Sequence, residues 1–137
     1  MGLQTLGPRV QLTISPLEPH IKALSDKGET PPPPVTGWGL IDTGASATCV
    51  DRAAAEKAGL AVVDSGPMAS AIHESEIVPI FAGRLDIGGI PQNIDMKRAY
   101  GAKLEPQGLI ALIGRDVLAV CVLVYNGVDG SFTLCVN

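Results

Sequence analysis

Apolar and polar residues alternate over many short stretches of the chain, which is the period expected of β-strands with one buried face. Glycine, proline, asparagine and aspartate, the usual turn residues, separate these stretches. The predicted strands are residues 10–14, 40–41, 48–50, 90–96 and 109–113, and hairpins are predicted at 69–86 and 120–136. The pattern therefore predicts a mainly β protein.

Helical signals are short and few. Asp51 is a good N-cap for a helix that begins at Arg52 and ends before Gly59, a residue suited to a left-handed C-cap. A further helical turn is expected at residues 115–119, and residues 97–108 are expected to form a loop. We therefore expect one or two short helices beside the strands.

Residues 16–34 interrupt the alternating pattern. They contain Pro16, Pro19 and the run from Pro31 to Pro34. Proline has no N–H group to donate to a neighbouring strand, and it destabilises the interior of a helix. We therefore predict an exposed, proline-rich loop insertion without helix or strand. Its proline run is expected to act as a stiff spacer, and a ligand for a proline-binding module is the alternative.

The composition agrees with a single domain over residues 1–137. The 16 glycines and 11 prolines favour turns and short strands over long helices, and the length suffices for one core. The net charge of -4 argues against a nucleic-acid partner, which needs a basic face. No apolar run reaches the roughly 20 residues of a membrane-spanning helix, so no membrane partner is expected.

The cysteines and histidines do not indicate a disulfide framework or a metal site. Cys49, Cys121 and Cys135 are odd in number and lack a C-x-x-C spacing, and His20 and His73 are too few and scattered. We expect neither a metal nor a cofactor. The first residues lack the blocks of a secretory signal, so we expect a cytoplasmic protein, with a secreted or membrane-anchored longer precursor as the alternative.

Candidate chemistry begins at residue 42. The apolar residues Leu40 and Ile41 lead into Asp42, Thr43 and Gly44, so a carboxylate stands where a strand turns. Backbone N–H groups of a tight turn can hold such a carboxylate rigidly, and the glycine allows a close approach.

A second segment, residues 111–118, contains two apolar residues followed by Gly-Arg-Asp, and Gly114 lies 70 residues after Gly44. The order and spacing of the two motifs resemble the retropepsin-like aspartic peptidases over residues 9–136. The resemblance implies a small closed β-barrel of the acid-protease type and endopeptidase activity on protein or peptide substrates. It also implies that the hairpin at 69–86 is a flap that covers a bound peptide.

The resemblance further implies roles for individual residues. Asp42 would be the catalytic acid, and Thr43 and Gly44 would support it by holding the turn rigid. Substrate would contact Gly44, Ala45, Leu112 and the flap residues Ala71, Ile72 and His73. Structural tasks would fall to Gly114, Arg115 and Asp116. For His73, a solvated hairpin tip is the alternative.

Peptide hydrolysis by carboxylates needs two of them, because one activates water while the other polarises the carbonyl oxygen. The chain offers one convincing copy, so the second is expected from another subunit across a two-fold axis. We therefore expect a homodimer, in which the resemblance implies that terminal strands of two subunits pair. The two acids would titrate as a pair, so activity is expected to fade as the pH rises past the upper value.

A rival copy of the triplet, Asp64-Ser65-Gly66, follows two valines. Gly66 lies only 22 residues after Gly44, which leaves no room for the supporting lobe that a second active carboxylate needs. Residues 64–67 are therefore expected to form a plain turn before the flap.

Two alternatives stay open. Retroviral members often carry an aspartate where this chain has Ser46, so the ion-pair partner of Arg115 is expected to be either Asp116 or Asp51. The function also has alternatives, because a fold does not guarantee turnover: a catalytically silent dimerisation or peptide-binding module, or an adaptor that presents residues 31–34.

Overall fold

The computed structural model describes residues 7–69 and 75–136, which form nine strands, three α-helices and one 3-10 helix. The strands are β1 Arg9–Ser15, β2 Val35–Ile41, β3 Cys49–Asp51, β4 Ala61–Ala69, β5 Ser75–Ile87, β6 Ile94–Ala102, β7 Ala111–Ile113, β8 Cys121–Tyr125 and β9 Phe132–Val136. The helices are α2 Glu18–Asp26, α3 Arg52–Ala58, α4 Arg115–Leu118 and the 3-10 helix η1 Glu105–Gln107. The prediction of a mainly β protein is confirmed, but there are three α-helices where one or two were expected.

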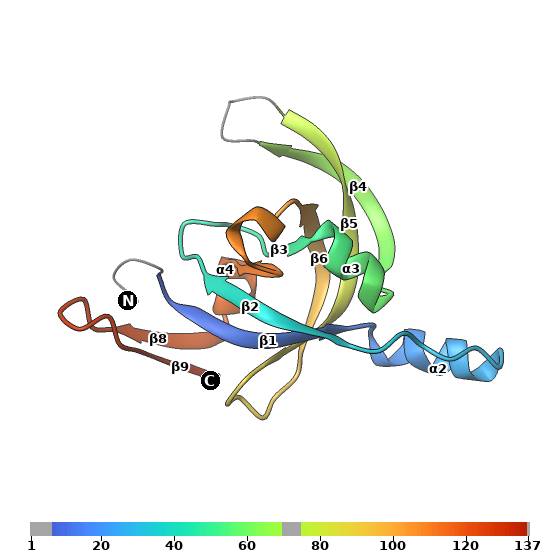
Figure 1. Ribbon diagram of the computed structural model, residues 1–137, viewed down its shortest axis with the longest axis horizontal. Helices are drawn as coiled ribbons and strands as arrows, with labels where there is room; N and C mark the ends of the chain where they lie inside the picture. Colours follow the sequence, from blue (N-terminus) through green and yellow to red (C-terminus); the bar gives the residue numbers. More distant parts are fainter. Residues whose placement is uncertain (1–6, 70–74, 137) are drawn as a thin grey trace.

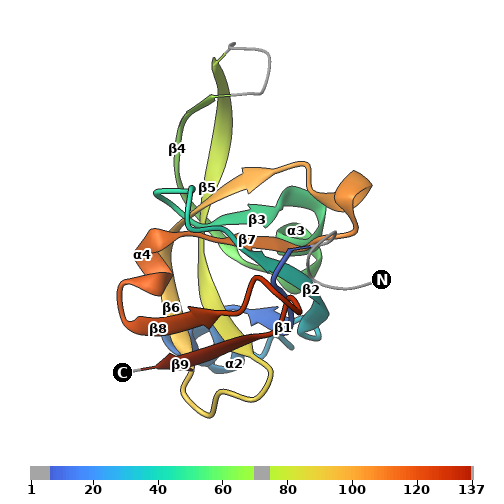
Figure 2. The same cartoon turned by 90° about the vertical axis from the view of Figure 1, so that its left-hand side faces the viewer.

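Seven strands form one sheet in the order β1-β2-β7-β3-β6-β5-β4. Figure 1 shows that this sheet is strongly curved. β1 pairs twice: residues 9–14 pair with β2, and residues 12–15 pair with β5. Because β1 joins two distant parts of the strand order, the sheet is largely closed. β4 stays at its edge and extends outward with β5 as a long hairpin (Figure 2).

The core lies inside the closed sheet, because the strands turn alternate apolar residues inward. Leu12 and Ile14 of β1, Val50 of β3 and Ile113 of β7 are all buried. Helix α3 adds the side chains of Ala54, Ala55 and Ala58 to the same core. Its predicted ends are confirmed: the Asp51 carboxylate accepts the Ala54 N–H, and Gly59 is left-handed with φ 77°.

The prediction that residues 16–34 contain no helix is wrong, because they include α2. Pro19 lies in the first turn of α2, where a backbone N–H has no helical partner to lose. Leu17, Ile21 and Leu24 recur at helical spacing and are half-buried. This helical spacing was the signal that the prolines obscured.

The proline run after α2 contacts the domain at the end of α3. A Cβ built on Gly59 would lie 2.9 Å from Pro32 Cγ, so the two residues are in close contact. The run is therefore seated on the domain at this point, while α2 extends away from the sheet on the side opposite β8 and β9 (Figure 1).

The hairpin predicted at residues 69–86 is longer than expected, because β4 pairs with β5 along its length. Residues 64–67, predicted as a plain turn, lie inside β4, so that prediction is wrong. Pairing with β5 outweighs the turn preference of these residues, and the edge position of β4 admits Pro67. The predicted tip with Ala71, Ile72 and His73 lies outside the described residues.

The strand predicted at 90–96 and the loop predicted at 97–108 are also corrected, because β6 begins at Ile94 and continues to Ala102. Of the predicted loop, only residues 103–108 lie outside a strand, and they include η1. The pairing register of β6 with β5 shifts once along its length. Lys97 and Arg98 are consequently both exposed, which breaks the alternation that marks a strand.

Residues 120–136, predicted as a hairpin, contain β8 and β9, which pair antiparallel as a separate two-stranded sheet. Figure 2 shows this hairpin below α4 and β7. Leu123 and Leu134 pack against the core, whereas Val122 and Val124 point outward and are 52% and 62% exposed. None of the helices in the described ranges has the length and apolar character needed to cross a bilayer.

Candidate functional site

Asp42 directly follows β2, and the neighbouring strand leads into the second motif. β2 and β7 run parallel, with Leu40 opposite Leu112 and Ile41 opposite Ile113. The Asp42 N–H donates to the Ile113 carbonyl at 2.9 Å. The structure thus brings the two motifs together at the carboxyl ends of adjacent parallel strands.

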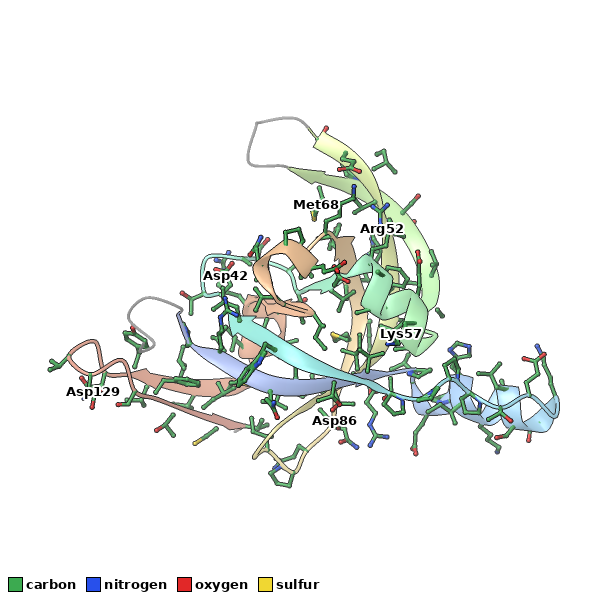
Figure 3. The ribbon with its side chains drawn as sticks, viewed as in Figure 1. Asp42, Arg52, Lys57, Met68, Asp86 and Asp129 are labelled. Carbon is green, nitrogen blue, oxygen red and sulfur yellow. The ribbon has the colours of Figure 1, made fainter. Side chains whose placement is uncertain are left out.

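The turn after β2 orients the Asp42 carboxylate. The Gly44 N–H donates to Asp42 Oδ1 at 3.0 Å, and the Ala45 N–H donates to the Asp42 carbonyl at 3.2 Å. Asp42 is half-buried, whereas Thr43 and Gly44 are exposed. Figure 3 shows Asp42 at the end of β2. A carboxylate that is fixed by an N–H group and still reachable can exchange a proton with a bound molecule.

Three residues, Thr48, Gly114 and Asp116, join the segment just after this turn to the start of α4, and we call them the clasp. The hydroxyl of the fully buried Thr48 donates to Asp116 Oδ1 at 2.7 Å and accepts the Gly114 N–H at 3.0 Å. The Thr48 N–H donates to Asp116 Oδ2 at 3.0 Å. A Cβ built on Gly114 would lie 2.6 Å from backbone atoms of Ala47, so only glycine fits there without a shift.

Arg115 supports the same turn through backbone carbonyls. Its Nη1 donates to the Thr43 carbonyl at 2.8 Å, and its N–H donates to the Ala45 carbonyl at 2.8 Å. The two carboxylates offered by the sequence as its partners bond elsewhere, Asp116 within the clasp and Asp51 at the start of α3. The question left open by the sequence thus has a third answer, a carbonyl in the Asp42 turn.

An open hollow of about 600 Å³ adjoins the Asp42 turn. It is lined by Gly7, Pro8, Leu40, Ile41, Asp42, Thr43, Leu123 and Tyr125. The last two residues belong to β8, so the hollow connects the carboxylate with the C-terminal hairpin.

A small apolar cluster lies on the same face of the sheet as Asp42. Its buried members are Ala102, Leu104 and Leu109, and its half-buried members are Leu40, Cys49, Met68 and Leu112. Met68 comes from β4, so the long hairpin contributes directly to this cluster (Figure 3). Burial, and then the charges of Asp116 and Asp42, raise the pKa of the Cys49 thiol, which therefore stays neutral at physiological pH.

The rival triplet has a different environment. Asp64 is exposed on β4, and its carboxylate accepts hydrogen bonds from Arg98 Nη1 at 2.9 Å and from the Ser65 N–H at 2.8 Å. The Arg98 hydrogen bond, followed by that of Ser65, lowers the pKa of Asp64. This triplet contributes no residue to the clasp or to the hollow beside Asp42.

The predicted site residues divide into two groups. Those near the first and second motifs, from Asp42 to Ala45 and from Leu112 to Asp116, gather around one turn. The predicted flap contacts Ala71, Ile72 and His73 lie outside the described residues.

Sequence reasoning missed Thr48 and Met68. Thr48 is a hydroxyl residue just before a strand, a weak signal that becomes meaningful only beside Asp116. Met68 has no local signal, because its place in the apolar cluster depends on the full length of β4.

Within residues 7–69 and 75–136, no group of three or more His, Cys, Asp and Glu side chains is arranged to hold a metal ion. Comparisons of the chain with protein-family models, with curated proteins and with solved structures found no match.

Proposed function

We propose that this chain is a homodimeric aspartic endopeptidase with a retropepsin-type barrel, in which each of two copies supplies one Asp42. The proposal depends mainly on the contact between the two motifs. Arg115 donates to a backbone carbonyl of the Asp42 turn, and the clasp joins the segment just after the turn to α4. Such bracing holds a reactive carboxylate in one geometry, which is what acid–base catalysis requires.

The chemistry follows from two carboxylates that share one proton. The ionised carboxylate takes a proton from a water molecule, and the oxygen of that water attacks the carbonyl carbon of the peptide bond. The protonated carboxyl group donates its hydrogen to the carbonyl oxygen, which forms a tetrahedral intermediate. The carboxyl group that took the proton from water then gives it to the nitrogen as the carbon–nitrogen bond breaks. A hydroxyl group of the intermediate returns its proton to the other carboxylate, so the pair again holds one proton.

The surface beside Asp42 supports a second copy of the chain as the partner. Leu123 and Tyr125 of β8 line the hollow next to Asp42, and the outward residues Val122 and Val124 leave an apolar face uncovered. Among the described residues, β8 and β9 pair only with each other, so each leaves an outer strand edge beside this apolar face, which favours pairing with another strand. A two-fold axis through this region would bring the second Asp42 to the first.

The substrate class is protein or peptide, because an extended chain can bind below the β4–β5 hairpin by strand addition. We propose the cytoplasm as the compartment. Cys49, Cys121 and Cys135 are all free thiols, as expected in a reducing environment.

The proposal is tested by cleavage of an unfolded protein substrate over a range of pH. Asp42→Asn should lower the rate by on the order of 10²–10⁴-fold while the dimer persists, because a side-chain amide neither takes a proton from water nor gives one to the substrate. Asp64→Asn is the matched control and should leave the rate unchanged. A pepstatin-type transition-state mimic should inhibit the wild type.

Unchanged cleavage by Asp42→Asn contradicts the proposal. A wild-type dimer that cleaves nothing at any pH also contradicts it and favours a catalytically silent peptide-binding module.

A further inference from the structure

We propose that Asp51 is a positioning residue that sets the shape of the apolar wall beside Asp42, and hence the side-chain preference of the enzyme. The inference rests on the proposed function, since the wall selects substrate only if substrate binds there. It concerns a residue that the sequence identified only as a helix cap or as a partner for Arg115.

The apolar wall is on the catalytic face of the sheet. Side chains alternate between the two faces of a strand, so Leu40 shares a face with Asp42, two positions later. Leu112 is the partner of Leu40 in β7 and of Cys49 in β3, so these three side chains lie side by side. The next residues along these strands, Ile41 after Leu40 and Ile113 after Leu112, point into the core instead.

The far end of this wall comes from the segment between β6 and β7. Leu104 and Leu109 are 3% and 2% exposed and form the buried part of the cluster against which Met68 packs. The Leu104 carbonyl accepts the N–H groups of Gln107 and Leu109, which bends the segment into a tight turn. The position of Leu104 therefore fixes the position of this end of the wall.

The Asp51 carboxylate holds that turn in place through hydrogen bonds. It is 6% exposed, and its Oδ1 accepts the N–H groups of Leu104 at 2.9 Å and Glu105 at 3.1 Å. Its Oδ2 accepts the Ala54 N–H at 3.1 Å and thereby caps α3. One buried carboxylate thus joins β3, α3 and the turn that carries Leu104, with a separate oxygen for each task.

The turn has open space on its α3 side. A hollow of about 310 Å³ separates α3 from the turn and is lined by Asp51, Arg52, Ala53, Glu56, Ala102, Lys103, Glu105 and Pro106. Because side chains do not fill this space, the turn is free to shift toward α3 when its hydrogen bonds to Asp51 are lost. Such a shift would carry Leu104 away from the cluster and widen the wall.

The discriminating variant is Asp51→Ser. A serine hydroxyl is a good N-cap and keeps the bond to Ala54, but its single oxygen cannot also hold Leu104 and Glu105. Two peptide substrates are compared that differ only by Leu or Ala at the position facing the wall, which a peptide-library digest of the wild type identifies. For Asp51→Ser, the ratio of kcat/KM for Leu over Ala should fall about ten-fold, through a higher KM with kcat unchanged.

Leu104→Ala provides the matched control, because it alters the wall directly. Leu104→Ala should also lower the ratio of kcat/KM for Leu over Ala. The double variant Asp51→Ser with Leu104→Ala should show no further change in this ratio, since both substitutions act through the Leu104 side chain. A loss of kcat with an unchanged ratio in Asp51→Ser, or additive effects in the double variant, would overturn the positioning role.

A second measurement does not depend on activity. With ¹³C-labelled methionine methyl groups, Asp51→Ser should shift the NMR resonance of Met68 and leave that of Met96, in the main core, in place. An unmoved Met68 resonance would also overturn the inference. If the wild type cleaves no substrate, the proposed function fails, and the Met68 resonance still decides whether Asp51 shapes the wall.

Discussion

Two segments of this chain have similar sequences and very different surroundings. Asp42-Thr43-Gly44 follows β2, which is paired on both sides, and Arg115 and the clasp brace it from the adjacent motif. Asp64-Ser65-Gly66 lies within the edge strand β4, and the exposed carboxylate of Asp64 bonds to Arg98. The first segment is a candidate reaction centre, and the second is part of a hairpin strand.

The triplet alone is therefore not enough to make a site. What distinguishes Asp42 is a parallel neighbour strand that leads into Arg115, which bonds to the turn, and into Gly114 and Asp116, which bond to Thr48 just after the turn. Asp64 instead pairs with Arg98, whose positive charge neutralises the carboxylate but does not place it beside a second motif.

The largest effect on this comparison is expected from Gly114→Ala. Its new Cβ would lie 2.6 Å from the Ala47 carbonyl carbon and oxygen, which are backbone atoms and cannot rotate away. We expect unfolding free energy to fall by about 3 kcal/mol, at the upper end for overpacking, together with loss of cleavage. Denaturant unfolding measures the change.

Gly66→Ala is the matched control for Gly114→Ala. Its new Cβ would meet the end of the Ile80 side chain at 3.3 Å, a contact that a small shift relieves. We expect a loss below about 1 kcal/mol. Equal losses at the two glycines would contradict the claim that the first triplet alone is tightly fastened.

A smaller effect is expected from Thr48→Val, which keeps the shape of the side chain and removes its hydroxyl. The buried Gly114 N–H would lose its acceptor and Asp116 would lose a donor, at a cost of about 2 kcal/mol. Thr36→Val removes an exposed hydroxyl pair with Thr13 and should barely change the melting temperature. A tolerated Thr48→Val would show that the clasp does not stabilise the turn.

The smallest effect is expected from the Asp64–Arg98 pair. The folded pKa of Asp64 is lowered, so the pair stabilises the protein above the ordinary carboxyl pKa of about 4, and this contribution is lost as the pH falls through the lowered value. The melting temperatures of wild type and Asp64→Asn should therefore differ slightly near pH 7 and converge in acid. Salt should reduce the difference, because both groups are exposed. A difference that grows in acid would contradict this sign.

The sequence was most informative where local rules and the fold agree. Asp51 and Gly59 marked the ends of α3, and the apolar strand before Asp42 was correctly placed beside a turn. These features depend on neighbours in sequence, so capping and alternation suffice to find them.

The errors occurred where pairing over long sequence distances decided the structure. Residues 64–67 of β4 have strong turn preferences, but they form a strand because β5 pairs with them from Asp64 to Ala69. A register shift in the pairing of β6 with β5 interrupts the alternation of exposed and buried residues in β6. The same limit applies to the site: the partners of Arg115 and Asp51 come from segments brought near by the sheet, and a linear pattern does not reveal which of them meet.

The central claim is that one chain carries half of a reaction centre, and a mixing experiment tests it most directly. Wild-type and Asp42→Asn chains are combined in equal amounts, unfolded together and refolded at a fixed total concentration, and peptide cleavage is measured. Only pairs of two wild-type chains would have two Asp42 carboxylates, so we expect about one quarter of the wild-type rate. A rate of about one half would mean that each chain works alone, and the shared reaction centre would be ruled out.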